Sequence, residues 1–162
     1  MKPMKKVGIY AGTFDPFTNG HLAILDRALD FLDEVILLVS VHGQKSPLLT
    51  VSQRVMMCRD LFKDRPRVIV DSWEGLTVDY ARKHNVKLLL RGLRPTGDFE
   101  NEIQMAALNR SLNPEVDTIF LTTEHYFVSS SLVREVLAYG SDIAKFVPEV
   151  IVRHLLDLKK NK

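Results

Sequence analysis

The sequence predicts an α/β protein built on a doubly wound, five-stranded parallel sheet with helices on both faces. Five short apolar runs rich in β-branched residues, typical of buried strands, are spread along the chain. They alternate with segments whose apolar residues recur every three or four positions, as on one side of a helix. The runs are apolar throughout, which a sheet covered on both faces requires. Alternating strands and helices favour a parallel sheet.

The five predicted strands are separated by intervals long enough to hold a helix, and each strand is bounded by turn-forming residues. They are Lys6–Tyr10, Val35–Val41, Arg67–Asp71, Val86–Leu90 and Thr118–Leu121.

The intervals and the C-terminal part carry helical patterns. A last helix is expected from about Pro148 to Lys160, because proline is favoured in the first turn of a helix. No internal repeat or linker interrupts the pattern, so residues 1–162 are predicted to form one Rossmann-like domain. The apolar positions that mark the other helices are Leu22, Leu25, Ala28, Leu29 and Leu32; Val51, Val55, Cys58, Leu61 and Phe62; Leu76, Tyr80 and Ala81; Ile103, Ala106, Ala107 and Leu112; and Leu132, Val133, Val136 and Leu137.

Composition excludes several classes of protein. The chain is 46% apolar and 26% charged, and its formal charge is +2, which argues against disorder and against a dedicated nucleic-acid binder. A single cysteine, Cys58, excludes an intramolecular disulfide framework, and its apolar surroundings predict a buried thiol. The longest uncharged stretches have ten residues, about half of a membrane span. We therefore expect a cytoplasmic protein that binds neither membrane nor nucleic acid.

Glycines and cations follow several of the predicted strands. Lys45 follows the second strand, and Arg91 to Arg94 follow the fourth. Because the carboxyl ends of parallel strands meet at one edge of the sheet, Lys45, Arg91 and Arg94 should converge there. Arginine binds phosphate through two N–H groups, and glycine lets backbone amides approach an anion. The sequence therefore predicts a polyphosphate ligand at this edge.

The common phosphate-binding motifs are absent. The chain contains neither G-x-x-x-x-G-K-[ST] nor G-x-G-x-x-G, which disfavours a P-loop kinase and an ordinary dehydrogenase. The informative stretch is instead Gly12–Leu22, which leaves the first strand and enters the first helix. Thr18 is expected to cap that helix and His21 to lie in its first turn, where free N–H groups and the helix dipole attract phosphate.

At these residues the sequence resembles the nucleotidylyltransferase superfamily, whose first signature is [HT]-x-G-H. Thr18-Asn19-Gly20-His21 matches it, and Val128–Arg134 matches the second signature, near I-S-S-[ST]-x-x-[RK]. Within the superfamily the chain is most similar to the bacterial phosphopantetheine adenylyltransferases, on Gly12–Pro16, Arg91–Arg94, Asp98–Glu102 and the serine triplet. Ala11 departs from the proline that is usual there.

The resemblance implies that ATP and 4′-phosphopantetheine react to give dephospho-coenzyme A and pyrophosphate, with Mg²⁺ accompanying ATP. It also implies a homohexamer and makes coenzyme A a candidate feedback ligand. No residue is predicted to ligate a metal. The residues implied in catalysis are Thr13, His21, Lys45 and Arg91. Those implied in ATP binding are Thr13, Phe14, His21, Gly92, Leu93, Arg94, Glu102, His125, Tyr126, Phe127, Val128, Ser129, Ser130 and Ser131. Those implied in phosphopantetheine binding are Thr13, Lys45, Leu76, Thr77 and Arg91.

Two alternatives stay open at this point. The first is a related transferase of the nicotinamide-mononucleotide adenylyltransferase or cytidylyltransferase type, which shares the first signature. The second is a non-catalytic nucleotide-binding domain, which fold alone does not exclude.

Overall fold

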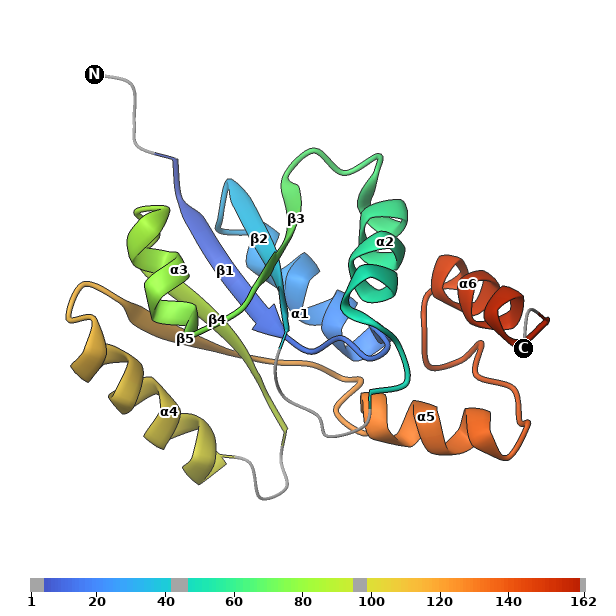
Figure 1. The fold of residues 1–162 in the computed structure, drawn as a ribbon. Coiled ribbons are helices and arrows are strands. Elements are labelled where there is room, and N and C mark those ends of the chain that lie inside the picture. The colour runs from blue at the N-terminus through green and yellow to red at the C-terminus, as the bar shows by residue number, and fades with distance from the viewer. Residues whose placement is uncertain (1–4, 42–46, 95–98, 161–162) are drawn as a thin grey trace.

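The protein is described from a computed structural model, which places residues 5–41, 47–94 and 99–160. Its centre is a sheet of five strands, each parallel to its neighbours, as Figure 1 shows. The strands are β1 (Val7–Gly12), β2 (Glu34–Ser40), β3 (Val68–Trp73), β4 (Leu88–Leu93) and β5 (Asp117–Thr122).

The strands lie in the order β3-β2-β1-β4-β5. The chain thus builds one half of the sheet outward from β1, returns to the centre, and builds the other half from β4. Pairing between β1 and β4 runs from Gly8 opposite Leu88 to Tyr10 opposite Leu90, although both strands continue beyond it. In doubly wound sheets, ligands bind at the carboxyl ends of the two strands between which the winding reverses.

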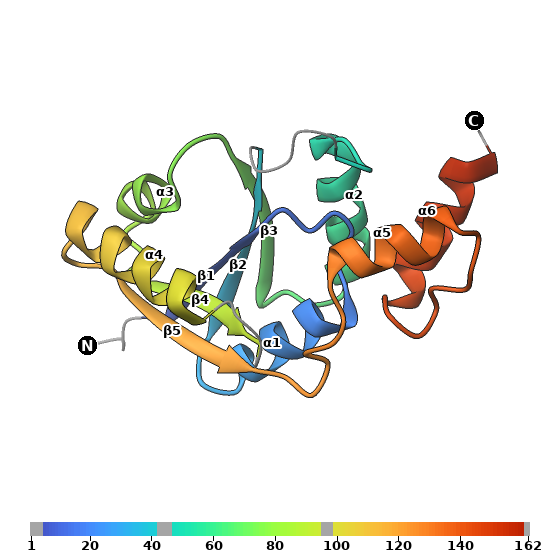
Figure 2. The same ribbon diagram turned by 90° about the horizontal axis from the view of Figure 1, so that it is seen from below.

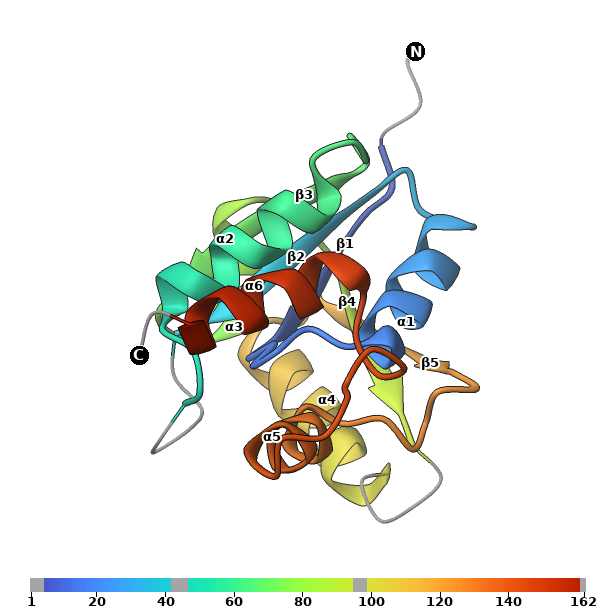
Figure 3. The ribbon, with the colours of Figure 1, turned by 90° about the vertical axis from the view of Figure 1, so that its right-hand side faces the viewer.

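Helices cover both faces of this sheet. Figures 1 and 2 show α1 and α2 on one side and α3 and α4 on the other, and Figure 3 shows α6 alongside α2. No helix in the described ranges combines the length and apolar character needed to cross a membrane. The helices are α1 (Asn19–Leu29), α2 (Val51–Phe62), α3 (Thr77–Lys83), α4 (Phe99–Leu112), α5 (Ser130–Ala138) and α6 (Glu149–Lys160).

Strand β2 shows why its buried part, Val35–Val39, is apolar at every position. Its odd-numbered residues, among them Val35 and Leu37, pack into one buried cluster with α1 and α2. The even-numbered Ile36 and Leu38 pack into a second cluster, which includes residues of α3. Successive side chains of a strand point to opposite faces, so burial on both sides leaves no position for a polar residue.

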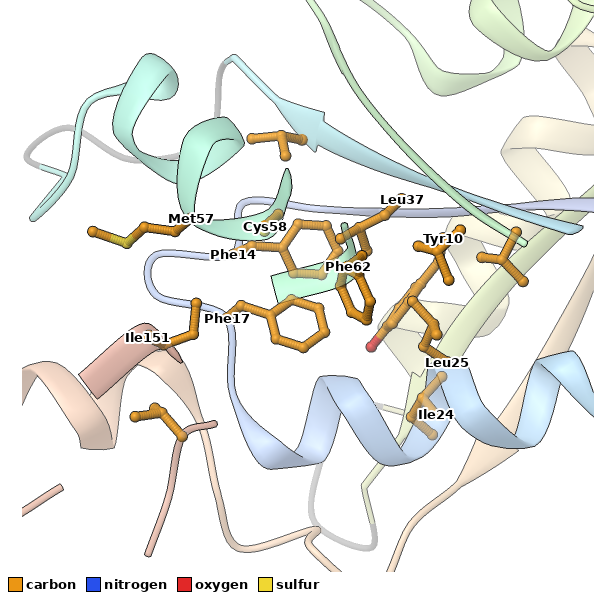
Figure 4. Close-up of a cluster of buried hydrophobic side chains, with 14 of the residues drawn as sticks. Tyr10, Phe14, Phe17, Ile24, Leu25, Leu37, Met57, Cys58, Phe62 and Ile151 are labelled. Carbon is orange, nitrogen blue, oxygen red and sulfur yellow. The ribbon is translucent and has the colours of Figure 1, made fainter. Parts of the chain in front are cut away.

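The segment between β1 and α1 is anchored by aromatic side chains. The ring centroids of Phe14 and Phe17 lie 5.4 Å apart, and those of Phe17 and Phe62 of α2 lie 5.5 Å apart. Figure 4 shows these rings together in the core, with Ile151 of α6 close by. Aromatic pairs at such distances add to the stabilisation from burial. Residues 13–18 are therefore held firmly although they form neither helix nor strand.

The predicted fold class is confirmed, and Cys58 is buried as expected. The predicted strand ends are less accurate. The fourth strand was expected to end at Leu90, but β4 continues to Leu93, so Arg91 lies within a strand. The reason is that its backbone goes on pairing with β5, with Arg91 opposite Phe120. A ladder of backbone hydrogen bonds does not depend on an apolar side chain.

Candidate active site

A cavity of about 480 Å³ opens at the carboxyl edge of the sheet, where β1 and β4 end. The end of β1, the first turn of α1, the end of β4 and the start of α5 all contribute to its wall. Most of the predicted site residues therefore share one space. Those that line it are Thr13, Phe14, His21, Thr77, Arg91, Gly92, Leu93, Arg94, Glu102, His125, Val128, Ser129, Ser130 and Ser131.

Thr18 caps helix α1 and His21 lies in its first turn, as the sequence predicted, and the cap also holds the His21 ring. The Thr18 hydroxyl accepts a hydrogen bond from the His21 amide, and the Thr18 amide donates to Nδ1 of the His21 ring at 3.0 Å. This reciprocal arrangement is a capping box in which histidine occupies the position usually taken by Glu or Gln. The cap thus orients the ring as well as starting the helix.

The same contact determines where the ring carries its proton. A backbone amide can only donate, so Nδ1 must accept, and the proton of the neutral ring lies on Nε2. Burial, reinforced by the positive charges of Arg94 and Arg91, lowers the pKa of His21 to about 3. His21 is therefore neutral near pH 7 and presents Nε2–H as a hydrogen-bond donor.

The segment between β1 and α1 is fastened to helix α5, which carries most of the second signature. The Ser130 hydroxyl donates to the carbonyl of Pro16 at 2.9 Å, and the Arg134 guanidinium donates to the carbonyl of Asp15 at 2.7 Å. A Cβ atom at Gly20 would lie 3.3 Å from the carbonyl oxygen of His125, so only glycine allows this approach without displacement. These contacts bring the first turns of α1 and α5 together, and each turn is an anion-attracting helix N-terminus.

The three serines at the start of α5 all have partners within the protein. Ser129 caps the helix by accepting from the Leu132 amide, and Ser131 accepts from Arg134. With the bond from Ser130 to Pro16, each hydroxyl is already engaged. Ser129 and Ser131 only accept in these bonds, so their O–H groups can still donate. Phosphate contacts by the serine hydroxyls stay a prediction, beside the backbone amides and the dipole of the helix.

Arg91 reaches across the edge of the sheet. Its Nε and Nη2 donate to the two carboxylate oxygens of Glu102 at 2.7 and 2.6 Å, and Nη1 donates to the carbonyl of Ala11 at 3.1 Å. This two-pronged pair fixes the plane of the guanidinium group. Glu102 was predicted to meet the ribose or adenine of ATP, and that contact stays a prediction, since the structure places its carboxylate on Arg91.

The cavity is cationic overall. Arg94 pairs with no carboxylate in the part of the chain that the structure describes, whereas Arg91 is balanced by Glu102. Both arginines line the cavity together with His21, and their positive charges add to the effect of burial in lowering the pKa of His21. A cavity of this sign suits a polyphosphate.

A second cavity, of about 210 Å³, adjoins the first under helices α3 and α4. Leu76, Met105 and Leu89 are among the apolar side chains that line it. Ala11, Thr77, Arg91 and Glu102 line both cavities, so the two cavities lie next to each other at the arginine.

Some predicted residues are not brought into the larger cavity. Leu76 lines the smaller one, and Lys45 lies outside the described residues. Tyr126 and Phe127 are exposed, at 51% and 58%, and do not line the cavity. Their proposed contact with ATP stays a prediction.

Sequence reasoning missed several residues in the wall of the larger cavity, among them Tyr10, Ile24, Ser40 and Thr123. Apolar strand and helix residues look like core, so Tyr10 and Ile24 gave no signal. Arg54 of α2 was also missed, although it does not line the cavity. It stands three residues after Val51 and four before Cys58, among the apolar positions that mark this helix. An arginine at such a position is buried only when its charge is satisfied.

In the described ranges, no group of three or more His, Cys, Asp and Glu side chains could hold a metal ion. Mg²⁺ is commonly bound by substrate phosphates and water with few protein ligands, so a polyphosphate in the cationic cavity would itself supply most of the ligands.

The family described as cytidylyltransferase-like matches residues 9–136, from strand β1 into helix α5. The match spans every segment that lines the cavity. The fold, the capped histidine and the cationic cavity, taken with this match, define the class of protein as a nucleotidylyltransferase.

Curated relatives narrow the class. A phosphopantetheine adenylyltransferase of Lachnoclostridium phytofermentans is 45% identical over 97% of this chain and 98% of its own length. That of Alkaliphilus metalliredigens is 44% identical over 91% of this chain and 96% of its own length. That of Anaeromyxobacter dehalogenans is 44% identical over 94% of this chain and 94% of its own length. The chain belongs to the phosphopantetheine adenylyltransferase family.

Proposed function

We propose that this protein transfers the adenylyl group of ATP to 4′-phosphopantetheine, giving dephospho-coenzyme A and pyrophosphate, a step of coenzyme A synthesis. The observation that carries the proposal is the junction of the two cavities, one cationic and one apolar, at Arg91. Phosphopantetheine has a phosphate at one end of a long uncharged arm. Its phosphate suits the junction, and its arm suits the apolar cavity beside Leu76 and Thr77.

The reaction needs no nucleophile from the protein. An oxygen of the phosphopantetheine phosphate attacks the α-phosphorus of ATP and forms a new P–O bond. The bond from the α-phosphorus to the oxygen that bridges to the β-phosphate breaks, and pyrophosphate leaves with that electron pair. Catalysis of such a transfer consists mainly of positioning and charge stabilisation.

His21 is proposed to stabilise the charge that builds on the α-phosphate. Its Nε2–H donates a hydrogen bond, and because the ring is neutral the bond forms without transfer of a proton. The capping box holds the ring in place before the substrate arrives, so little reorganisation is needed at the moment of reaction.

Thr13, Lys45 and Arg91 are proposed to bring the two anions together. Two unit charges 4 Å apart repel by about 4 kcal/mol at the effective dielectric constant near a protein surface. A cation beside the attacking phosphate offsets that repulsion. Arg91 is already aligned by Glu102 and the Ala11 carbonyl, and Thr13 lies at the exit of β1 in the same cavity wall.

The rest of ATP is proposed to extend from the α1 turn toward β4 and α5. Gly92, Leu93 and Arg94 would border the nucleoside, and the segment from His125 to Ser131 would hold the β- and γ-phosphates at the helix N-terminus. Mg²⁺, bound to the phosphate oxygens of ATP, would neutralise part of the charge on the leaving pyrophosphate.

We further propose that the protein acts in the cytoplasm as a homohexamer and that coenzyme A is a feedback ligand, since it contains the product's own structure. Helix α4 supports self-association because it buries none of its residues and exposes large apolar side chains. These are Phe99, Ile103, Met105, Leu108 and Leu112. Light scattering on a size-exclusion column should give six times the mass of the 18.5 kDa chain.

A pyrophosphate-release assay tests the reaction. We expect release from ATP only when phosphopantetheine is present, with dephospho-coenzyme A identified by mass spectrometry. Nicotinamide mononucleotide as acceptor, and CTP in place of ATP, should give little product. Preference for either would favour the related transferases, and ATP binding without release under any condition would favour a non-catalytic domain.

A further inference from the structure

A buried arginine lies directly behind the cavity without lining it. Arg54 of helix α2 is only 4% exposed, and its guanidinium donates to three backbone carbonyls from three different segments. Nη1 donates to Thr13 at 2.7 Å and to Ser40 at 2.9 Å, and Nε donates to Leu49 at 3.3 Å. Two of these three residues, Thr13 and Ser40, line the larger cavity.

These contacts join segments that β-sheet pairing leaves unconnected. Thr13 follows the last residue of β1, and Ser40 is the last residue of β2. Strand β1 pairs with β2 only as far as Gly12, which lies opposite Val39. Beyond that point, the bonds from Arg54 set the distance between the two strand exits.

Asp15 completes the arrangement from the other side. Its carboxylate, 1% exposed, accepts hydrogen bonds from the amides of Leu48 and Leu49, both at 2.9 Å. Its negative charge favours the charged form of Arg54 and opposes the lowering of the pKa of Arg54 by burial. A buried charge is costly unless polar groups and opposite charge compensate it, and this guanidinium has three carbonyl acceptors and the negative charge of Asp15 acting on it.

We propose that Arg54 is a positioning residue for adenylyl transfer, which fixes Thr13 at the strand exit relative to Ser40. This inference rests on the proposed function and adds to it a residue that touches neither substrate. Removing the guanidinium leaves the Thr13 carbonyl without its donor and frees the strand exit to shift. A displacement of about 1 Å at a site of this kind costs about a hundredfold in rate.

The test compares substitutions at Arg54 with one at a matched arginine. Arg67 also donates to three backbone carbonyls, those of Leu29, Leu32 and Asp33, but at the opposite edge of the sheet. We expect Arg54→Ala to lower kcat about a hundredfold, with the KM of each substrate changed less than about threefold, the pattern of a lost transition-state interaction. Arg67→Ala should keep the wild-type kcat although it too loses three bonds.

Two further measurements separate positioning from folding. Arg54→Lys retains the charge, but its side chain ends one bond short of the Nη1 atom that binds Thr13 and Ser40 and lacks the Nε donor, so it should fold and still lose about tenfold in kcat. Methylguanidinium, added at a concentration that does not denature the protein, should restore part of the kcat of Arg54→Ala and leave Arg67→Ala unaffected. If Arg54→Ala does not fold, the kcat of the lysine variant decides.

The outcomes are distinct. If the wild-type protein is active and the Arg54 variants have the same kcat as Arg67→Ala, the positioning role alone is overturned. Equal losses of kcat in the Arg54 and Arg67 variants would assign both to general structure and also overturn it. A wild-type chain that releases no pyrophosphate with phosphopantetheine would overturn the proposed function, and this inference with it.

Discussion

Replacing His21 separates the two roles that the structure gives it, as a helix cap and as a hydrogen-bond donor. His21→Ala removes both the Nδ1 acceptor of the Thr18 amide and the Nε2–H donor. Loss of one pre-oriented donor to a developing anion costs about 10²–10³ in kcat, or roughly 3–4 kcal/mol of transition-state stabilisation. Loss of the cap contact costs about 1 kcal/mol of folding stability.

The size of these two effects shows how to distinguish them. A loss of about 1 kcal/mol is too small to unfold a domain of ordinary stability, so the fall in kcat will report the chemistry. His21→Gln is the control for the cap, since helix α2 begins with the same capping box, in which Gln53 accepts from the Thr50 amide at 2.9 Å. We expect His21→Gln to unfold at the wild-type denaturant concentration.

We would measure steady-state pyrophosphate release and denaturant unfolding for the wild type, His21→Ala and His21→Gln. The glutamine amide can also donate, so His21→Gln should recover part of the rate that His21→Ala loses. Turnover of His21→Ala within tenfold of wild type would refute the donor role. A marked loss of stability in His21→Gln would refute the assignment of the cap.

Two further predictions concern charge. Because burial lowers the pKa of His21 to about 3, the unfolded chain binds a proton between pH 6.5 and 3 that the folded chain does not, so stability falls as pH falls through this window. At pH 5 this pKa shift alone would lower the free energy of unfolding by about 2 kcal/mol. Because the ring is partly exposed to the cavity, we expect a loss of about 1–2 kcal/mol. Denaturant unfolding at pH 7.5 and pH 5 should show that the wild type loses about 1–2 kcal/mol more unfolding free energy than His21→Gln. Equal losses in the two proteins would contradict the lowered pKa of His21. Arg91→Ala should weaken phosphopantetheine binding more than ATP binding in isothermal titration, because Arg91 stands where the two cavities meet; equal losses would count against this placement.

The order of strands and helices was predictable because burial leaves a local record. A strand such as β2, covered on both faces, must be apolar at each buried position, and a helix with one buried face must repeat its apolar residues every three or four positions. Thr18 as a cap and His21 in the first turn were predictable for the same reason, since capping involves residues three positions apart.

The ends of strands were predicted less well. The fourth strand was predicted to end at Leu90 because the apolar run ends there, yet backbone pairing with β5 continues to Leu93. Side-chain polarity records which faces are buried, whereas the end of a ladder depends on where the neighbouring strand runs.

The sequence by itself determined the alternating fold, the capped histidine and the presence of cations near one edge of the sheet, because each leaves a pattern within a few consecutive residues. Only the tertiary structure decided that Glu102 aligns Arg91, that Ser130 binds the Pro16 carbonyl, and that Arg54 joins the exits of β1 and β2. These contacts connect residues between 11 and 114 positions apart. Their geometry arises from how strands and helices pack, so no local pattern in the chain can specify it.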